Sequence, residues 1–469
     1  MINKSWILAI CLLAGCATVP RDAGFADVQQ QVQAHLDQQV TWQRGGAEDA
    51  AVASQVGLLL AKPVDVDAAV RIALINHRGL QAEYEELGIA QADLVQAGLL
   101  RNPVFGWGRQ EGGGITKTVW GVEFDFLGLL LMAPHKKLET LRLEHAKLRV
   151  TQAVLRHAME TRKAWFDAQS AAQVASFMRN VAVLTAAEAE LAERQRKAGN
   201  LGRRDALRQQ AFDAETRMRL IEAETMAFAS RERLNRMMGL QGDDTCWTLP
   251  GRLPELPQAM PNFGDIEAWG LHRRVDLQLA QKEAETLAAG LKLTRDTRFI
   301  NVFDLGVATE RTTGEKRISG PTLKLELPIF DQGQVRVSRQ EAIYRQSEAR
   351  LYALAVDARS EIRESSQRTL SSYENARRIR DVLVPLRRRI VEESNLHYNG
   401  MLIGVYELLA DAREQVNAVQ NHIAATRDFW NALADLQMAV GGKLPVDVRE
   451  GAPEKENDME QSQHGAHAQ

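Results

Sequence analysis

Two very long segments without glycine or proline constrain the fold more than any other feature of this sequence. They run from His135 to Ala198 and from Val335 to Val384. A helix rises ~1.5 Å per residue, so the first segment would reach about 95 Å, which is far more than an ordinary globular domain can bury. Helices of this length need neighbouring helices on their flanks and water on at least one face.

Apolar residues form narrow seams along both segments, at spacings that predict coiled-coil packing. The seam residues are Leu141, Leu148, Leu155, Val174, Phe177, Val181, Leu184 and Leu191 in the first copy, and Ile379, Leu383, Leu386 and Ile390 in the second. Pro385 falls inside the second seam and predicts a kink or short break there. Pro134 precedes the first segment, where a first-turn proline is tolerated.

Composition and motifs argue against several classes of protein. Only 6% of the residues are aromatic and the formal net charge is −3, so nothing indicates a nucleic-acid partner. The sequence has no nucleophile motif, phosphate-binding loop or His/Cys cluster at ligand spacing, so it predicts neither an enzyme nor a cofactor. His464 and His467 in the tail are too weak a pattern to predict a metal site.

A short β-hairpin precedes each long segment. The first is predicted from Val104 to Gln110 and from Thr116 to Phe126, around a Gly-rich turn. The second pairs a strand from Asn301 to Glu310 with an alternating strand that includes Leu323 to Leu327. Alternation places Trp120, Val122, Phe124 and Phe126 on one face and Lys117, Glu123 and Asp125 on the other.

Such two-faced strands have two explanations. They fit the half-buried sheet of a soluble domain, or the wall of a membrane barrel with lipid outside and water inside. The aromatic residues favour the membrane, since aromatic side chains gather near membrane interfaces. These residues are Phe105, Trp107, Trp120, Phe124 and Phe303.

The N-terminus also indicates a membrane location. Residues 1–15 have the charge and apolar run of a secretory signal peptide. The run Leu13-Ala14-Gly15-Cys16 resembles a bacterial lipobox, which implies that Cys16 is lipidated, and Ala17 implies the outer membrane. The alternative is an ordinary signal peptide with a chance cysteine. No later apolar stretch approaches the ~20 residues of a spanning helix, so any membrane crossing must use strands.

The sequence contains an internal duplication. Leu80-Gln81-Ala82 returns as Leu277-Gln278-Leu279, and each copy has the order helix, hairpin, long helix, turn and return helix. The predicted segments are a lipid-anchored stretch 16–65, a first repeat 66–240 with its hairpin at 104–127, a Pro/Gly-rich linker 241–262 that contains Cys246, a second repeat 263–441 with its hairpin at 299–328, and a disordered tail 442–469.

Each long helix ends in a Gly-containing turn. Gly199 and Gly400 suit the left-handed cap that ends a helix, and Asp205 and Glu407 fall in the first turn of the return helix, where negative charge is favoured. These turns fit ordinary helix hairpins, but two matched turns so far from the β-hairpins suggest a docking surface. Its candidate residues are Gly199, Leu201, Gly202, Asp205, Gly400, Ile403 and Gly404.

Together these features resemble the TolC-like outer-membrane efflux channels. The resemblance covers Val64 to Gly441 and rests on the lipobox, the duplicated order, the tip turns and the run Leu327 to Gly333. In the first copy, Phe126 to Pro134 departs from the expected Pro-Ile-Phe type of run. The resemblance implies an α+β fold, in which each chain gives four strands to a twelve-stranded barrel of a homotrimer, continued by a long α-helical barrel in the periplasm.

The resemblance also implies a passive duct. A periplasmic adaptor would dock on the tip turns, and an inner-membrane pump, of the resistance-nodulation-division type, would deliver small molecules or metal ions. Carboxylates that close the tunnel would include Glu407 and Asp411. By strand alternation, the barrel lumen would be lined by Glu123, Asp125, Asp304, Lys324 and Glu326.

Two alternatives remain open from the sequence. One is the outer-membrane component of a type I protein secretion system. The other is a lipid-anchored periplasmic coiled-coil scaffold that conducts nothing and whose mature chain is soluble without its lipid. Four strands in one chain cannot close a pore, since single-chain barrels need about eight or more, so the channel interpretation requires self-association.

Overall fold

A computed structural model describes residues 18–445. Cys16, the predicted signal peptide, His464 and His467 lie outside the described residues. The chain divides into two compact units, and each draws on both copies of the duplication. Unit 1 comprises the described residues up to Asp37, together with Arg78–Val154 and Arg274–Asp357. Unit 2 comprises Gln38–His77, Leu155–Arg273 and the described residues from Ala358 onward.

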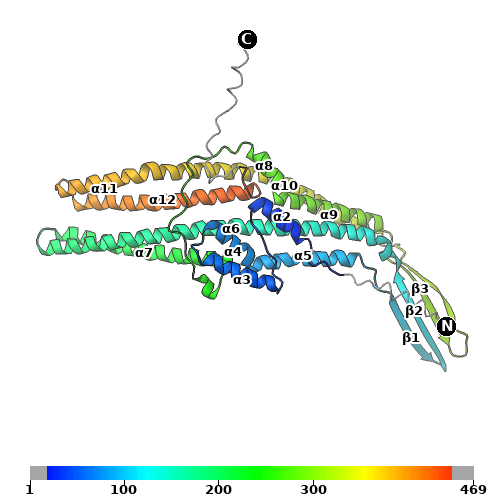
Figure 1. The fold of residues 1–469 in the computed structure, drawn as a ribbon. Helices are drawn as coiled ribbons and strands as arrows, with labels where there is room; N and C mark the ends of the chain where they lie inside the picture. Colours follow the sequence, from blue (N-terminus) through cyan, green and yellow to red (C-terminus); the bar gives the residue numbers. More distant parts are fainter. Residues whose placement is uncertain (1–17, 446–469) are drawn as a thin grey trace, which may run out of the picture. The chain divides into compact units, whose positions relative to one another are not determined.

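Unit 1 joins a four-stranded antiparallel sheet to long helices (Figure 1). The strand order β1-β2-β3-β4 follows the sequence, and β2 pairs with β3, so the sheet unites the hairpins of the two copies. This confirms the predicted α+β class. The strands are β1 (Val104–Gly112), β2 (Ile115–Asp125), β3 (Phe303–Thr312) and β4 (Ile318–Leu325), and the helices are α2 (Phe25–Leu36), α5 (Arg78–Ala97), α9 (Val275–Thr297) and the beginnings of α6 (Phe126–Lys197) and α10 (Gln334–Arg378).

The first strand-to-helix junction differs from the prediction. Helix α6 begins at Phe126, directly after β2, so Phe126 does not extend the strand face and Pro134 lies inside the helix rather than in its first turn. The cause is Asp125, whose Oδ1 accepts the backbone N–H of Gly128 at 2.7 Å, a bond that satisfies a free donor of the first helical turn. In the second copy, residues 326–333 separate β4 from α10.

Unit 2 packs the remaining helices around an aromatic core. The Phe166 and Trp430 rings stack with centroids 5.6 Å apart, and the Trp165 indole donates to the Val64 carbonyl at 2.9 Å. Its helices are α3 (Ala47–Leu60), α4 (Val66–Asn76), the rest of α6, α7 (Arg203–Met238), α8 (Ile266–Arg273), the rest of α10, α11 (Val384–Asn399) and α12 (Val405–Ala439). Leu444 is buried in this core, so the prediction of disorder is wrong for residues 442–445.

The linker between the copies is fixed to the same core. Its backbone carbonyls accept hydrogen bonds from three side chains: Gln169 to Pro250 at 2.7 Å, Trp430 to Pro254 at 3.1 Å and Tyr373 to Gln258 at 2.9 Å. Proline has no backbone N–H, so a Pro-rich linker has few backbone donors of its own for its carbonyl groups. Side-chain donors from the surrounding helices supply these hydrogen bonds instead. Cys246, in this linker, is exposed.

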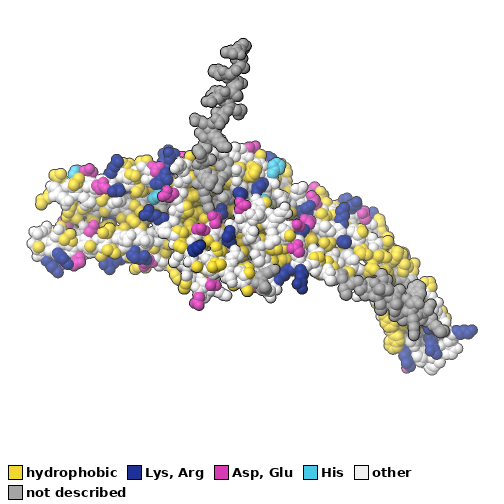
Figure 2. All heavy atoms as spheres, viewed as in Figure 1, with side chains coloured by type: hydrophobic (Ala, Val, Ile, Leu, Met, Phe, Trp, Pro, Cys, Tyr) yellow, Lys and Arg dark blue, Asp and Glu magenta, His cyan; other side chains and the backbone are white. Residues whose placement is uncertain are grey.

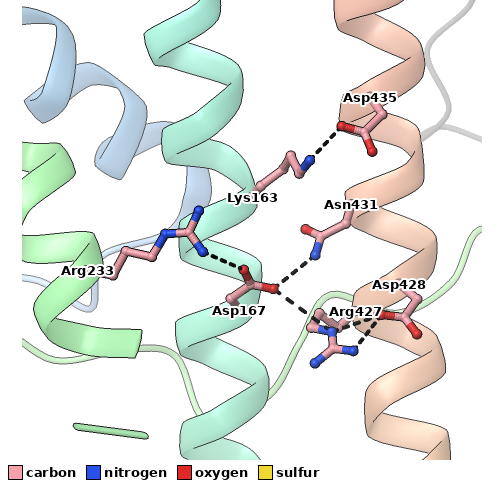
Figure 3. A network of polar contacts seen from close by, with 7 residues as sticks. All are labelled: Lys163, Asp167, Arg233, Arg427, Asp428, Asn431 and Asp435. Carbon is pink, nitrogen blue, oxygen red and sulfur yellow. Dashed lines mark hydrogen bonds and ion pairs between the residues drawn. The ribbon is translucent and has the colours of Figure 1, made fainter. Parts of the chain in front are cut away.

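A polar network connects α6, α7 and α12 beside the aromatic core (Figure 3). The Asp167 carboxylate accepts the Asn431 amide at 3.0 Å and lies 3.7 Å from Arg233 and 3.9 Å from Arg427. One turn away, Lys163 contacts Asp435 at 2.7 Å. These contacts link the long helix of the first copy to the return helices of both copies.

The second long helix departs from the α pattern near Pro385, as predicted. Ile379–Leu383 form a single π-helical turn between α10 and α11. Pro385 then lies at the start of α11, where the missing N–H disturbs the fewest backbone hydrogen bonds. Among the described residues, no helix combines the length and the apolar character needed to cross a membrane.

Candidate channel-lining site

The register of the sheet defines its two faces. Trp107 pairs with Trp120, and Trp120 pairs with Thr309. Paired residues in an antiparallel sheet point to the same side, so most of the large apolar residues of the four strands share one face. This apolar face comprises Phe105, Trp107, Trp120, Val122, Phe124, Phe303, Leu305, Val307, Pro321, Leu323 and Leu325.

The apolar face is open to its surroundings within the described chain. Phe105 is 65% exposed, Trp107 64% and Leu323 63%. A contiguous exposed apolar surface of this kind marks a contact with lipid or with another protein. The interior of a soluble sheet would instead bury these side chains, so the exposure favours the membrane explanation of the hairpins.

The opposite face carries the charged residues predicted to line a lumen. The structure brings Glu123, Asp125, Asp304 and Lys324 together at the helical end of the sheet, where Asp125 pairs with Asp304 and Asp304 with Lys324. Lys324 Nζ lies 3.6 Å from Asp304 and 3.9 Å from Glu123. Val104, Val119 and Ile318 also lie on this polar face.

Other polar groups extend the polar face toward the helices. Glu326, just beyond β4, accepts the Asn301 amide at 3.0 Å, and Asn301 in turn accepts from Arg336 at 2.8 Å. Arg101 pairs with Asp125 at 3.1 Å. An open cavity of about 1140 Å³ lies between these residues and helices α5 and α6 within unit 1. Sequence reasoning missed Arg101 and Arg336, because both lie outside the alternating strands.

Among the described residues, Lys324 is the one basic side chain that forms ion pairs with two of the predicted lumen carboxylates. We therefore expect Lys324→Gln to raise the cation-to-anion permeability ratio about fivefold, since one close charge in water is worth ~1 kcal/mol. Reversal potentials in a salt gradient measure this ratio. Lys316→Gln, in the β3–β4 turn, is the control, and an equal shift in both variants would contradict a specific role for Lys324.

Two glycines on the polar face have no room for a side chain. A Cβ on Gly306 would lie 2.5 Å from the Val122 carbonyl oxygen and 2.7 Å from Thr322 Oγ1, and a Cβ on Gly121 would lie 2.9 Å from the Val307 oxygen. These close approaches join β2 to β3, the pairing that unites the two copies. Glycine therefore permits the strands to approach closely on this face.

We expect Gly306→Ala to destabilise the sheet by about 1–3 kcal/mol, the usual cost of overpacking. Gly320→Ala is the matched control, because a Cβ at this neighbouring strand position meets open space. The thermal stability of the purified protein measures the difference. Equal melting temperatures for the two variants would show that the backbone relaxes around the new methyl group.

The two tip turns lie in unit 2 and differ in charge. Around the α6–α7 turn, residues 190–208 include six Lys or Arg and three Asp or Glu residues, and basic side chains gather there (Figure 2). Residues 392–411, around the α11–α12 turn, include four acidic residues and no Lys or Arg. Phe212, Val405 and Leu409 pack together and connect the two helix hairpins.

The caps of the two turns are not equivalent. Gly199 has a φ of +81° and forms the predicted left-handed cap. The same prediction for Gly400 is wrong, because its φ is −81° and Met401 takes the left-handed conformation at +55°. The left-handed residue is thus displaced by one position, and Met401 and Leu402 project with 93% and 74% of their surfaces exposed.

The candidate constriction carboxylates have different surroundings. Glu407 is exposed in the first turn of α12, whereas Asp411 accepts a hydrogen bond from Ser394 Oγ at 2.5 Å. Asp411 therefore helps to hold α11 against α12, and Glu407 is the freer of the two. Leu201, Gly202, Asp205, Ile403 and Gly404 lie in or beside the turns. Among residues 18–445 no cluster of three or more potential metal ligands occurs.

Solved structures with the same architecture are outer-membrane proteins. VceC of Vibrio cholerae matches with a TM-score of 0.67 at 15% identity, over 80% of this chain and 96% of that one. The CmeC channel of Campylobacter jejuni gives 0.70 at 14% identity, over 82% and 87%. The open MtrE channel of Neisseria gonorrhoeae gives 0.60 at 15%, over 83% and 89%. The chain has the TolC-like outer-membrane channel fold. No protein-family model and no curated protein sequence matches it.

The TolC-like fold accounts for the order of elements that the sequence predicted. The matches extend over four fifths of the chain. Because the sequence identities are low, these matches show the fold alone. The conducted substrate and the partners must therefore be argued from this chain's own residues.

Proposed function

We propose that this protein is the outer-membrane exit duct of a three-component efflux system. It would conduct small molecules or metal ions passively, as a homotrimer anchored through lipidated Cys16 and extending into the periplasm. A periplasmic adaptor and an inner-membrane pump of the resistance-nodulation-division type would complete the system.

One observation carries this proposal: a sheet with an exposed apolar face, a charged face and two open edges. Among the described strands, β1 and β4 each have a neighbour on one side only. A bilayer does not tolerate unpaired strand edges, so the edges must pair with further copies of the chain. Three copies give the twelve strands that the TolC-like resemblance implies, with the apolar face toward lipid and Glu123, Asp125, Asp304, Lys324 and Glu326 toward water.

The decisive experiment is conductance. The full-length protein, purified in detergent, should run as a heat-modifiable trimer and form ion-conducting pores in a planar bilayer. A monomer without conductance supports the scaffold alternative, and a mature chain that stays soluble without its lipid does the same. Transport of an unfolded polypeptide rather than small solutes would favour the protein-secretion alternative.

The tip turns are the proposed docking surface for the adaptor. The α11–α12 turn offers exposed Met401, Leu402 and Tyr406 on an acidic background, whereas the α6–α7 turn is basic. Exposed apolar groups with a charged rim are typical of binding surfaces. Glu407, in the same turn, would face the tunnel entrance as the leading constriction candidate, with Asp411 beside it.

We expect Leu402→Asp to lower efflux in cells by about tenfold or more, since loss of a central apolar contact costs at least ~1–2 kcal/mol. Accumulation of a fluorescent dye that cells with the wild-type protein export measures the effect. Leu58→Asp is the matched control, because Leu58 on α3 is 73% exposed and Leu402 is 74% exposed. Unchanged accumulation in the Leu402 variant would remove this turn from the docking surface.

A further inference from the structure

The apolar face of the sheet ends in a row of arginines at its hairpin end. Arg109 pairs with Thr118, and Thr118 pairs with Arg311, one step beyond the row that contains Trp107 and Trp120. Cross-strand partners share a face, so Arg109 and Arg311 lie on the same side as the two tryptophans. This side is the one that the proposed function turns toward lipid.

Arg317 belongs to the same surface, although it precedes β4. Its guanidinium carbon lies 5.1 Å from the centroid of the Trp120 ring, a distance typical of a cation–π contact. Two independent observations, strand register and a measured ring contact, thus place three arginines together. We call Arg109, Arg311 and Arg317 the arginine row.

The arginine row is poorly neutralised by the protein. Arg109 contacts Glu111, but within residues 18–445 neither Arg311 nor Arg317 forms an ion pair with a carboxylate. The polar face at the same level is different, because Lys117 pairs with Glu310 at 2.8 Å. The chain therefore balances its charge on the polar face and leaves positive charge on the apolar side. Figure 2 shows Lys and Arg side chains at the hairpin end of the sheet.

The position and chemistry of the row fit a phosphate group. Tryptophans such as Trp107 and Trp120 mark the boundary between hydrocarbon and headgroups, and a long arginine just beyond them can keep its stem in apolar surroundings and its head in the polar layer. Guanidinium groups bind phosphate oxygens through paired hydrogen bonds. Binding of a free anion would not depend on the adjacent apolar band, whereas binding of a lipid would.

We propose that the arginine row is a binding site for the phosphate groups of a phosphorylated lipid in the outer leaflet. The proposal rests on the membrane orientation given by the proposed function. In the trimer the site occurs once per chain, so each pore would hold a ring of phosphorylated lipids at its outer rim. The lipid would replace the missing carboxylates as the counter-charge of Arg311 and Arg317.

Native mass spectrometry of the full-length trimer in detergent tests this proposal, with lipid A as the phosphomonoester probe. The wild type should retain lipid A, and the variant Arg109→Gln, Arg311→Gln, Arg317→Gln should bind it at least tenfold more weakly, since each basic residue near a charged lipid surface strengthens binding. The matched variant Arg339→Gln, Arg345→Gln, Arg350→Gln removes three exposed arginines of α10 and should retain lipid A.

Two controls identify the ligand. Dephosphorylated lipid A should bind the wild type as weakly as lipid A binds the row variant, and excess inorganic phosphate should not displace lipid A. Equal retention by the two triple variants overturns the proposal, as does displacement by inorganic phosphate. Trimer bands and conductance of the wild type test the proposed function separately. A conducting trimer that does not bind lipid A would therefore refute this inference alone.

Discussion

Val122→Arg should prevent the protein from assembling in the outer membrane. Val122 lies in the middle of the apolar face, paired with Phe105 and Val307, and is 42% exposed. An arginine that faces lipid in a membrane barrel costs up to about 2–4 kcal/mol, depending on its depth, and a trimer carries the cost three times. Loss of the heat-modifiable trimer from outer-membrane fractions is the expected measurement.

Val119→Arg is the matched control for this experiment. It makes the same substitution three residues earlier on β2, where Val119 is 36% exposed on the polar face and pairs with Gly108 and Glu310. We expect this variant to assemble and to change ion selectivity only. If both variants assemble equally well, the apolar face does not contact lipid, and the soluble-sheet alternative gains support.

Acidification should destabilise unit 2 through His157. This histidine lies beside His77, with ring centroids 4.2 Å apart, and its Nε2 is 2.9 Å from the Met237 carbonyl oxygen. Burial, reinforced by the neighbouring His77, lowers the pKa of His157 from 6.5 to about 4. The folded state therefore holds the neutral ring, whereas the unfolded chain takes up a proton as the pH falls below about 6.5.

The sign of the effect follows from this difference in proton uptake. Between pH 6.5 and about pH 4 the unfolded state binds more protons, so stability is complete above this range and falls through it. A shift of this size predicts a loss on the order of 2–3 kcal/mol between about pH 7.5 and pH 4.5. Thermal unfolding of the full-length protein in detergent at several pH values measures the loss.

His157→Gln should remove most of this pH dependence, because a glutamine amide can still donate to Met237 but cannot titrate. Burial also lowers the pKa of His77, His145 and His422, so a smaller acid-sensitive component should remain. His397→Gln, at an exposed histidine of α11, is the control and should leave the profile unchanged. A wild-type protein that is equally stable at both ends of the pH range would refute the assignment.

The sequence predicted the α+β class and the strand faces because each depends on local pattern. Alternation along β2 assigns Val122 and Glu123 to opposite faces. When four such strands pair, their apolar residues gather on one face and their charged residues on the other. The Gly/Pro-free segments likewise contained almost all of the two long helices. The start of α6 was harder, since Asp125 continues the strand alternation and also caps the helix, and the sequence does not show which role ends the strand.

Other features required the three-dimensional register. The arginine row combines residues from three strands or their turns, and nothing in the sequence places Arg317 against Trp120. The left-handed Met401 was missed because glycine is the usual residue for that conformation, and Gly400 stands directly before it. The hydrogen bond between Ser394 and Asp411 depends on how α11 meets α12, which local spacing does not specify.

The pairing of β2 with β3 has a consequence for biogenesis. Thr116 and Thr313, bonded across this ladder, are 197 positions apart in the chain. The N-terminal hairpin must therefore wait, with an unsatisfied β2 edge, until the C-terminal hairpin has been synthesised, and contacts this distant in sequence form slowly. Exposed strand edges can pair with the wrong partner, so the new chain should depend on a holding chaperone until its sheet is complete.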